Sequence, residues 1–487
     1  MGEHVTLFPL EFNRSIRIEV RPDRLTADAG AVLLREVIER LAITDWLVKR
    51  LRDPRKPKYI THPLTELLNT ALLLLAQGWR DHDDADFLRD DPALRLAVSQ
   101  RGGVAPLLKR PRPEGQRLSR NPEVPDGLAS QPTLSRLVAM LADPFHRAVL
   151  RQSLMEVAAR RMKAMGVGQL ADIVIDVDSL PVPVEGHQPG SEHNGHYHAR
   201  VYHPLIASVA ETGDLLDAEL RDGNVHTADG ALAFMLRIVD EAKRLLADRV
   251  TLRFDAGFPD EKLLAALEAP LIPYLARLKN NPVLDRMAAP HLRRPPGRPP
   301  AEPRIWCYEK TYQAQSWSCA RRVVLVVLER PDELFVHHFW LVTDLTLDEI
   351  HGRDLLSCYR ERGTAEARMG ELMDVLAPAL SSSPRTKSHY RGRPLDETNA
   401  PCDSFAHNEV RLLLNALAYN LLHTTRALLG AATGTGWSLR RLRERLLRVP
   451  ARILIHSRRA VLVVASPFAA LWNLLTAQLA QLRLAEA

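Results

Sequence analysis

Residues 171–179, ADIVIDVDS, constrain the fold of this chain more than any other segment. The β-branched apolar residues predict a buried strand, and the acids at its end indicate that it runs out to a polar edge of a sheet. Strand patterns follow at 196–210 and 214–221, then a helix pattern at 228–248 and a strand pattern at 250–258. The predicted order of elements is therefore β-β-β-α-β.

The acids in this pattern indicate the fold class. One acid ends the first strand and another, Asp255, ends the fourth, which is the plan of a ribonuclease-H-like core. We therefore expect an α/β fold in which a mixed five-stranded sheet is flanked by helices. Segment 303–345 is rich in strand-forming residues and predicts a β-rich insertion after the first part of this core. Residues 26–165 carry helical periodicity.

The charge balance suits a polyanionic partner. The chain of 487 residues has a net charge of +6, and eight arginines stand against one acid, Glu444, between Arg440 and Arg459. We predict that this stretch forms a surface that meets phosphates. Charged residues make up 25% and hydrophobic residues 46% of the chain, an ordinary globular balance that predicts a folded protein.

Cysteine usage and apolar segments argue against other classes of protein. The four cysteines form no CxxC pair and no tight cluster, which disfavours a zinc site or a disulfide framework and favours a reducing cytosol. The N-terminus lacks a basic stretch followed by an apolar core, so no signal peptide is expected. The apolar run 72–76 is too short to cross a bilayer. We expect a cytoplasmic, nucleoid-associated protein with no membrane partner.

Three acids stand where two-metal phosphodiester chemistry needs them. That chemistry requires carboxylates that converge on one spot, so that two ions clamp the attacking and leaving oxygens. Asp178 ends the first strand, Asp255 closes the fourth, and Glu366 lies in a helix after the β-rich segment. Oxygen ligands favour Mg²⁺ or Mn²⁺ over zinc. Asp176, on the same strand face as Asp178, is an alternative ligand or a structural partner, and acids at strand ends also cap loops or face solvent.

The helix around Glu366 adds an argument from spacing. Tyr359, Arg362, Glu366 and Met373 are offset by three, seven and fourteen residues, which brings them within roughly 60° of each other on one continuous helix. Tyr359 and Arg362 are candidates to steady DNA phosphates, because arginine forks onto phosphate oxygens. Gly363 is a candidate break in the helix, and a solvated Arg–Glu pair is the alternative interpretation.

From about Leu25 to Leu429 the chain resembles the transposases of the insertion sequence 1380 family, a branch of the bacterial DDE transposases. No single motif is decisive, but their number and order make the resemblance specific. The motifs are LASQPTLSR, IDVDS followed by EGHQ, HNGHYHARVYHPL, RDGNVH, LRFDAGF, YQAQSWSCARRVV, FWLVTDL, YRERGTAEARMGEL and HNEVRLLLNALAYNLL.

The resemblance implies metal-dependent DNA strand cleavage and transfer at the terminal inverted repeats of a mobile element. The family's acids fall on Asp178, Asp255 and Glu366, and its Tyr–Arg–Glu signature on Tyr359, Arg362 and Glu366. The expected cofactor is a pair of Mg²⁺ or Mn²⁺ ions. The expected partners are double-stranded DNA, as terminal repeats and target, and a second copy of the chain in a synaptic homodimer.

These expectations divide the chain into four regions. We predict a mainly helical, DNA-binding region at 1–165, with a disordered loop near 107–127 where proline and arginine interrupt the helical pattern. The first part of the ribonuclease-H-like catalytic core follows at 166–285, and the β-rich insertion at 286–345. Residues 346–487 hold the helix that carries Glu366 and a C-terminal helical region.

Three departures from the family pattern leave open whether this copy transposes. Met373 replaces a lysine expected seven residues after Glu366, an aspartate-rich stretch expected after the first strand is reduced to SLPVPVEG, and the segment 385–400 has the character of an insertion. A ribonuclease-H-like nuclease that cleaves without joining is one alternative to a transposase, because the sequence does not separate the two. A non-catalytic DNA-binding protein derived from a transposase is the other, although the three acids are intact.

Two weaker patterns also bear on DNA binding. Arg391 and Arg393 belong to an Arg-Gly-Arg-Pro sequence, the core of an AT-hook, whose arginines enter a narrow A·T minor groove; a solvated loop is the alternative. Trp306, Trp317 and Trp340 lie in the β-rich segment. They are candidates either to stack on an extruded base or to pack the core of the insertion.

Overall fold

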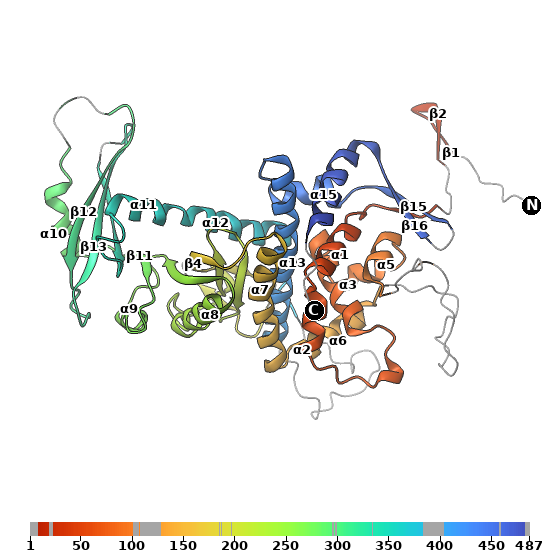
Figure 1. The fold of residues 1–487 in the computed structure, drawn as a ribbon, viewed down its shortest axis with the longest axis horizontal. Coiled ribbons are helices and arrows are strands. Elements are labelled where there is room, and N and C mark those ends of the chain that lie inside the picture. The colour runs from red at the N-terminus through yellow and green to blue at the C-terminus, as the bar shows by residue number, and fades with distance from the viewer. Residues whose placement is uncertain are drawn as a thin grey trace, which may run out of the picture.

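A sheet-bearing lobe and a helical lobe meet along one long helix, α13 (Ser404–Thr433), in the computed structural model (Figure 1). Helix α13 contacts α7 and β9 on the sheet side and α1, α3 and α15 on the helical side. The described residues are 8–18, 23–100, 107, 128–184, 186, 188–195, 197–294, 297, 300–333, 335–382, 404–456 and 459–482.

The N-terminal part of the chain is helical, as its periodicity predicts. Within the described residues, seven α-helices precede the large sheet: α1 (Ala31–Arg40), α2 (Ile43–Arg50), α3 (Leu64–Gln77), α4 (Asp83–Phe87), α5 (Pro92–Val98), α6 (Gln131–Leu141) and α7 (Pro144–Ala164). Helix α3 is apolar on nearly all sides and is buried along most of its length, because α13, α5 and α2 surround it. Apart from Leu107, the predicted loop at 107–127 lies outside the described residues.

The C-terminal part of the chain completes the helical lobe. It contributes α14 (Leu439–Leu442), a short π-helix (Arg443–Leu447) and α15 (Ala469–Gln481). Strand β15 (Ala451–His456) pairs with β16 (Arg459–Val464) on one side and with β3 (Leu25–Thr26) on the other, so segments far apart in the sequence share one small sheet. Strands β1 (Phe8–Leu10) and β2 (Asn13–Ile18) form a separate hairpin.

The arginine-rich segment corrects one prediction. Gly78 ends α3 with a φ of 92°, a left-handed conformation that glycine adopts readily. Arg443 then donates to the carbonyls of Ala76 and Val375, and Arg448 donates to the carbonyl of Gln77. The last carbonyls of α3 have no partner within their own helix, so these guanidinium groups satisfy them. Part of the segment predicted to meet phosphates is therefore used inside the fold.

The large sheet has eight strands rather than the five expected. Its order is β12-β13-β14-β11-β10-β4-β8-β9. The strands are β4 (Leu170–Ser179), β8 (Leu205–Val209), β9 (Leu215–Glu219), β10 (Ala247–Phe254), β11 (Tyr274–Leu278), β12 (Arg304–Tyr312), β13 (Arg321–Glu329) and β14 (His337–Thr343). Strands β4, β10 and β11 run parallel, β8 runs antiparallel to β4, and β9, which pairs antiparallel with β8, runs in the direction of β4 again.

The three extra strands come from the predicted β-rich insertion. The segment is β-rich as expected, but β14 pairs with β11 along Leu275↔Thr343 to Leu278↔Trp340 and so continues the core sheet. Helices α8 (Ala231–Leu245), α9 (Glu261–Glu268) and α10 (Pro282–Ala288) accompany the sheet. The insertion therefore stands at one end of the sheet-bearing lobe, far from the helical lobe (Figure 1).

The strand predicted at 196–210 is divided in two. Strand β7 (Ala199–Tyr202) leaves the large sheet and pairs with β5 (Val182–Pro183) and β6 (Glu192–Asn194), whereas β8 pairs with β4. Pro204 lies between β7 and β8, and proline cannot donate to a strand ladder. In the sequence, β5, the first strand of this small sheet, follows shortly after β4 ends at Ser179.

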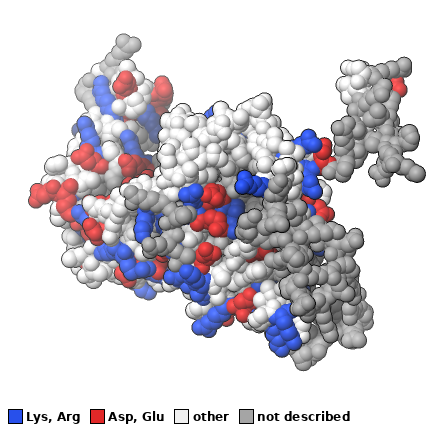
Figure 2. All heavy atoms as spheres, turned by 45° about the vertical axis from the view of Figure 1, so that its right-hand side comes forward, with Lys and Arg blue, Asp and Glu red and all other residues white. Residues whose placement is uncertain are grey.

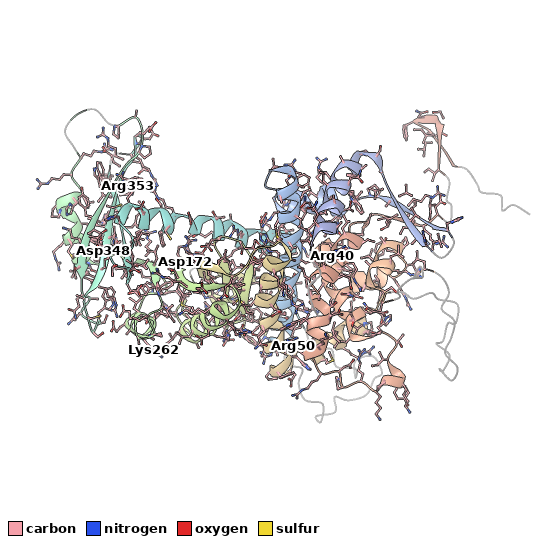
Figure 3. The ribbon with its side chains drawn as sticks, in the orientation of Figure 1. Arg40, Arg50, Asp172, Lys262, Asp348 and Arg353 are labelled. Carbon is pink, nitrogen blue, oxygen red and sulfur yellow. The ribbon has the colours of Figure 1, made fainter. Side chains whose placement is uncertain are left out.

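The surface carries charges of both signs. On the face shown in Figure 2, basic and acidic side chains are intermingled. Figure 3 places Asp172 and Lys262 on the sheet-bearing lobe and Arg40 and Arg50 on the helical lobe. Within the described ranges, none of the helices combines the length and the apolar character that a membrane span requires.

Candidate active site

A long helical rod brings Glu366 to the sheet. Helices α11 (Gly352–Arg360) and α12 (Arg362–Glu371) are joined by Glu361, whose φ of −60° and ψ of −18° are helical, so the two run on as one rod (Figure 1). Gly363 therefore does not end the helix. A π-helical turn (Leu372–Leu376) follows α12. The shared face predicted for Tyr359, Arg362 and Glu366 thus rests on a nearly continuous helix.

Arg362 joins two of the three predicted acids. One terminal nitrogen of its guanidinium donates to Oδ2 of Asp178, and the other donates to Oε1 of Glu366. The Arg362 side chain is only 12% exposed, whereas that of Glu366 is 57% exposed. The pairing of Arg362 with Glu366 is therefore more than a solvated contact within one helix, because a third charge from β4 takes part in it.

The register of two strands brings Asp255 to the same place. Strands β4 and β10 are parallel, with Val177 beside Phe254, so Asp178 and Asp255 follow at the same edge of the sheet. The backbone N–H of Gly257 donates to Oδ1 of Asp255 at 2.8 Å. A side chain at Gly257 would meet that oxygen at 3.1 Å, so glycine allows the turn to close against the acid.

The charges of the three acids act on one another. Burial raises the pKa of Asp178 from 3.8 to about 6; Arg362 opposes this shift, and the charges of Asp255 and Glu366 add to it. The pKa of Arg362 is raised, because Asp178, Tyr359 and Glu366 outweigh its burial. Asp178, Asp255 and Glu366 therefore form one electrostatic unit, although they lie far apart in the sequence.

Asp176, the alternative ligand, is held by a different arginine. Arg253 donates from Nε to Oδ1 of Asp176 at 2.6 Å and from Nη2 to Oδ2 at 2.8 Å. The side chains are 0% and 2% exposed, and Arg253 also donates to the carbonyl of Cys358 in α11. Both oxygens of Asp176 are thus engaged inside the protein, and the pair fixes α11 on the sheet. Asp176 fits the structural role better than the ligand role.

The donor chemistry of the site fits a hard divalent cation. Asp178, Asp255 and Glu366 offer only carboxylate oxygens, the ligands that Mg²⁺ and Mn²⁺ prefer. Among the residues that the structure describes, no group of three or more histidine, cysteine, aspartate or glutamate side chains is arranged to hold a metal ion. The guanidinium of Arg362 instead lies between Asp178 and Glu366.

Three further side chains surround the acids. Tyr359 is partly buried; burial raises its pKa, and Arg362 and Arg277 oppose this shift. The pKa of Tyr197 is raised by burial and by the charges of Asp178 and Asp255. Sequence reasoning proposed Tyr359 but missed Arg277 and Tyr197, and only the position of Tyr197 in the quoted HNGHYHARVYHPL motif pointed to it.

The RDGNVH motif forms a loop held by its own arginine. Arg221 donates from Nε to the carbonyl of His203 and from Nη1 to the carbonyls of His226, Thr227 and Asp229. Burial lowers the pKa of Arg221 to about 10. Thr227 in turn lies against Gly257, where a Cβ would meet it at 3.0 Å. The loop thereby supports the turn that carries Asp255.

A pocket lies beside this turn, between the core and the insertion. Its lining includes His226, Gly257, Lys279, Tyr312 and Trp317. The indole of Trp317 packs edge-on against Tyr312 and is 8% exposed. Trp340 is fully buried and Trp306 packs against the same core. Trp317 and Trp340 are thus core residues, Trp306 is partly buried against the core, and Trp317 also lines the pocket.

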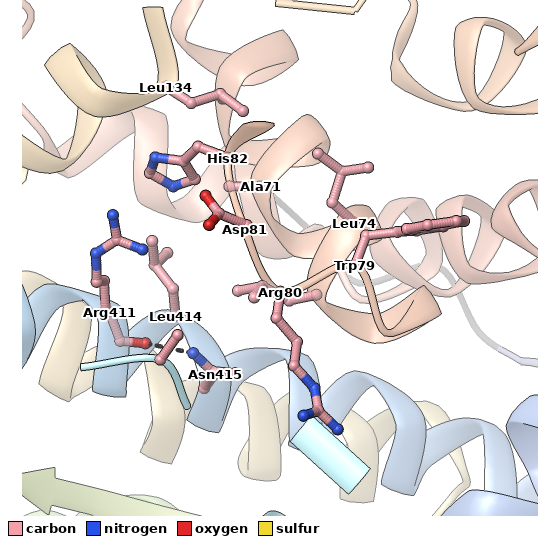
Figure 4. Close-up of a pocket in the computed structure, with 12 residues that line it drawn as sticks. Ala71, Leu74, Trp79, Arg80, Asp81, His82, Leu134, Arg411, Leu414 and Asn415 are labelled. Carbon is pink, nitrogen blue, oxygen red and sulfur yellow. Dashed lines mark hydrogen bonds between the residues drawn. The ribbon is translucent and has the colours of Figure 1, made fainter. Parts of the chain in front are cut away.

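A second pocket lies in the helical lobe, away from the acids (Figure 4). His82 and Arg411 line it; burial and the charge of Arg411 lower the pKa of His82 to about 4. Arg411 donates to the hydroxyl of Ser382 at 2.8 Å. Of the described residues in its lining, Asp81 is the one acid, so this pocket lacks the carboxylates of two-ion chemistry.

The remaining predicted residues fall outside the acidic cluster. Met373, in place of the expected lysine, is partly buried and packs against the core of the helical lobe. A methionine suits that position because the π-helical turn leads the rod into apolar surroundings. The AT-hook candidates Arg391 and Arg393 lie outside the described residues.

Comparison with known proteins gives the family. A family model described as "Transposase DDE domain group 1" matches residues 8–485. No curated protein matches the sequence. Among solved structures, a similar chain is a piggyBac transposase in a synaptic complex with hairpin DNA, with 10% identity and a TM-score of 0.41 over 91% of this chain and 82% of that chain. Because the family model spans nearly the whole length, this chain belongs to the DDE transposase family, domain group 1.

Proposed function

We propose that this protein is an insertion-sequence transposase of the 1380-family type that cleaves DNA at the ends of its element and joins them to a target. Asp178, Asp255 and Glu366 hold two Mg²⁺ or Mn²⁺ ions in this proposal. The observation that carries it is the contact of Arg362 with both Asp178 and Glu366, at the sheet edge where Asp255 also ends its strand.

The order of the strands supports a ribonuclease-H-like core. Strand β4 has β8 beside it, antiparallel, with β9 beyond and antiparallel to β8, and it has β10 and β11 parallel on the other side. In such a sheet the carboxyl ends of the parallel strands meet at one edge, which is a favoured place for a site. Glu366 reaches that edge from the helix that follows the insertion.

The chemistry proposed is in-line phosphoryl transfer. When bound, the ions would activate the attacking oxygen and neutralise charge on the leaving one. Water first attacks a phosphodiester at the element end, and the P–O bond to the 3′ oxygen breaks, which leaves a free 3′-hydroxyl. That hydroxyl then attacks a phosphodiester of the opposite strand or of the target, and another 3′ oxygen leaves.

The chain's own residues orient the DNA in this scheme. Tyr359 lies close enough to Asp255 and Glu366 to feel their charges, Arg277 lies close to Tyr359, and both would contact DNA phosphates. Gly257 and the loop held by Arg221 keep Asp255 in place. The helical region at 1–165 would bind the terminal repeats, and a second copy of the chain would complete the synaptic complex in the bacterial cytoplasm.

A labelled DNA end taken from the element's own terminal repeats tests this function. The full chain is incubated with the DNA and Mg²⁺, alongside Asp255→Asn and the control Asp172→Asn. Asp172 lies on the same strand as Asp178 but its side chain is 69% exposed, at the far end of β4. We expect cleavage and joining with the wild type and the control, and neither with Asp255→Asn.

The other outcomes distinguish the alternatives. Cleavage without joining would indicate a nuclease. Binding to the repeats with no Mg²⁺-dependent product, in the wild type as in Asp255→Asn, would indicate a non-catalytic DNA-binding protein. The mass of the complex on paired ends, measured by light scattering, tests the homodimer.

A further inference from the structure

The contact between Arg362 and the two acids has a consequence for ion binding. The guanidinium reaches Asp178 with one terminal nitrogen and Glu366 with the other. It thus does with a single positive group what a shared divalent ion would do, which is to bridge two carboxylates that repel each other. The positive charge of the guanidinium would repel a cation bound by the same two carboxylates.

We propose that Arg362 competes with the divalent cation for Asp178 and Glu366, so that loading the site requires this arginine to turn away. The inference rests on the proposed function, because it takes these acids to be the ion ligands. Arg362 is then a positioning residue with two arrangements, one paired with the acids and one released toward the DNA.

The surroundings of Arg362 allow such a movement. The residue starts α12, directly after Glu361, and Glu366 on the next turn is exposed, so the site is open on that side. Tyr359 lies one turn earlier, and Arg277 lies close enough to influence it. A released guanidinium would therefore join Tyr359 and Arg277, where a phosphate would meet two arginines together.

The pair formed by Arg253 and Asp176 shows why Arg362 and not Arg253 is the exchangeable group. Arg253 is fully buried and is also bonded to the carbonyl of Cys358, so its release would leave buried polar groups without partners. Arg362 bonds to acids alone among the contacts found for its side chain within the described residues. A cation that replaced it would satisfy the same oxygens.

Mn²⁺ binding to the full chain, without DNA, tests the competition. Calorimetric titration compares the wild type with Arg362→Gln, which keeps length and polarity but cannot pair with both acids as a cation. We expect Arg362→Gln to bind Mn²⁺ more tightly by about tenfold, since a competitor present in nine molecules of ten lowers the apparent affinity by that factor. We also expect Mn²⁺ to raise the melting temperature of Arg362→Gln more than that of the wild type.

Two further variants separate competition from a general effect of charge. Arg277→Gln removes a nearby positive charge that does not bridge the acids, and it should tighten binding far less. Arg362→Lys keeps the charge but loses the fork, so its affinity should lie between those of the wild type and Arg362→Gln. It also preserves the test if Arg362→Gln does not fold.

Three results would overturn the inference. Binding to Arg362→Gln that is equal to or weaker than binding to the wild type would exclude competition, as would equal tightening by Arg277→Gln. If Asp178→Asn leaves Mn²⁺ binding unchanged in the wild type, in Arg362→Gln and in Arg277→Gln, these acids hold no ion. That last result would also remove the basis of the proposed function, whereas the first two would leave it standing.

Discussion

Two aspartates on one strand, two residues apart, have opposite environments. Asp176 forms two hydrogen bonds with Arg253 in the interior, where both side chains are almost without exposure. Asp178 shares Arg362 with Glu366 at the edge of the sheet, close to the charge of Asp255. The first pair is buried, and the one further acid near Arg253 among the described ion pairs is the exposed Glu361 at 3.7 Å. The second has more negative than positive charge and is open on the side of Glu366.

The difference shows what each pair does for the protein. A buried pair with all its oxygens engaged holds α11 on the sheet, and breaking it leaves a charge in the interior. An excess of carboxylates around one arginine destabilises the fold, because the acids repel each other and lose solvation. Such an arrangement is typical of a functional site, where charges needed for the reaction are kept although they lower the stability of the fold.

The largest predicted effect is on activity, and it concerns Asp178. Asp178→Asn should lower the rate of DNA end cleavage by about 10³-fold or more, because it removes a charge that stabilises the transition state. The protein should remain folded. The assay is the labelled-end reaction, with the exposed Asp172→Asn as the control. A cleavage rate in Asp178→Asn close to that of the wild type would show that cleavage does not need the Asp178 carboxylate.

The second predicted effect is on stability, and it concerns Asp176. Asp176→Asn should lower the free energy of unfolding by about 3 to 5 kcal/mol, since Arg253 would keep its charge in the interior with only the exposed Glu361, 3.7 Å from its Nη1, as a counter-charge. Urea unfolding followed by circular dichroism measures this. Asp172→Asn should change the value by about 0.5 kcal/mol or less. If Asp176→Asn is as stable as the wild type, Asp176 is not the fixed partner described above.

The pH dependence should sharpen the comparison further. The pKa of Asp178 is raised in the folded protein from 3.8 to about 6, so its contribution to stability is fully present below 3.8 and is lost as the pH rises through 6. Asp178→Asn lacks this loss. Between pH 3.5 and pH 6.5, the free energy of unfolding of Asp178→Asn should therefore rise by on the order of 2 to 3 kcal/mol relative to that of the wild type. A difference in unfolding free energy that stays constant over this range would contradict the raised pKa.

The smallest effect concerns the far end of the same helical rod. Met373→Lys restores the lysine that the family resemblance leads one to expect. Because Met373 is only partly buried, a lysine could extend its amine to solvent, and the loss of stability should be about 1 kcal/mol or less. The salt dependence of binding to the DNA end should steepen by about one phosphate contact. An unchanged salt dependence would mean that position 373 does not face the DNA.

Much of this arrangement could be predicted from the sequence. The β-branched run before Asp178 and the strand before Asp255 predicted the two strands, and local pattern sufficed because the second half of each strand is mostly buried. The choice between Asp176 and Asp178 was left open, since spacing alone puts both on one face. The register of β4 with β10 places Arg253 beside Asp176, and that contact favours a structural role for Asp176.

Other features depend on contacts between distant segments. The sequence predicts a basic surface at Arg443 and Arg448. In the structure both donate to carbonyls at the end of α3, more than 300 residues away in the sequence. The pairing of β14 with β11 enlarged the sheet, and strand composition does not say which edge a strand joins. The bridge from Arg362 to Asp178 also spans distant segments, so spacing on the helix predicted only its contact with Glu366.

The central claim is that Asp178, Asp255 and Glu366 form one ion-binding site, and a crystal of the full chain soaked in Mn²⁺ tests it most directly. We expect anomalous density at about 2.1 Å from an oxygen of Asp178 and also in contact with Asp255 or Glu366, with the guanidinium of Arg362 turned away. Density at another place, or none while Arg362 still bridges Asp178 and Glu366 at saturating Mn²⁺, would contradict the account.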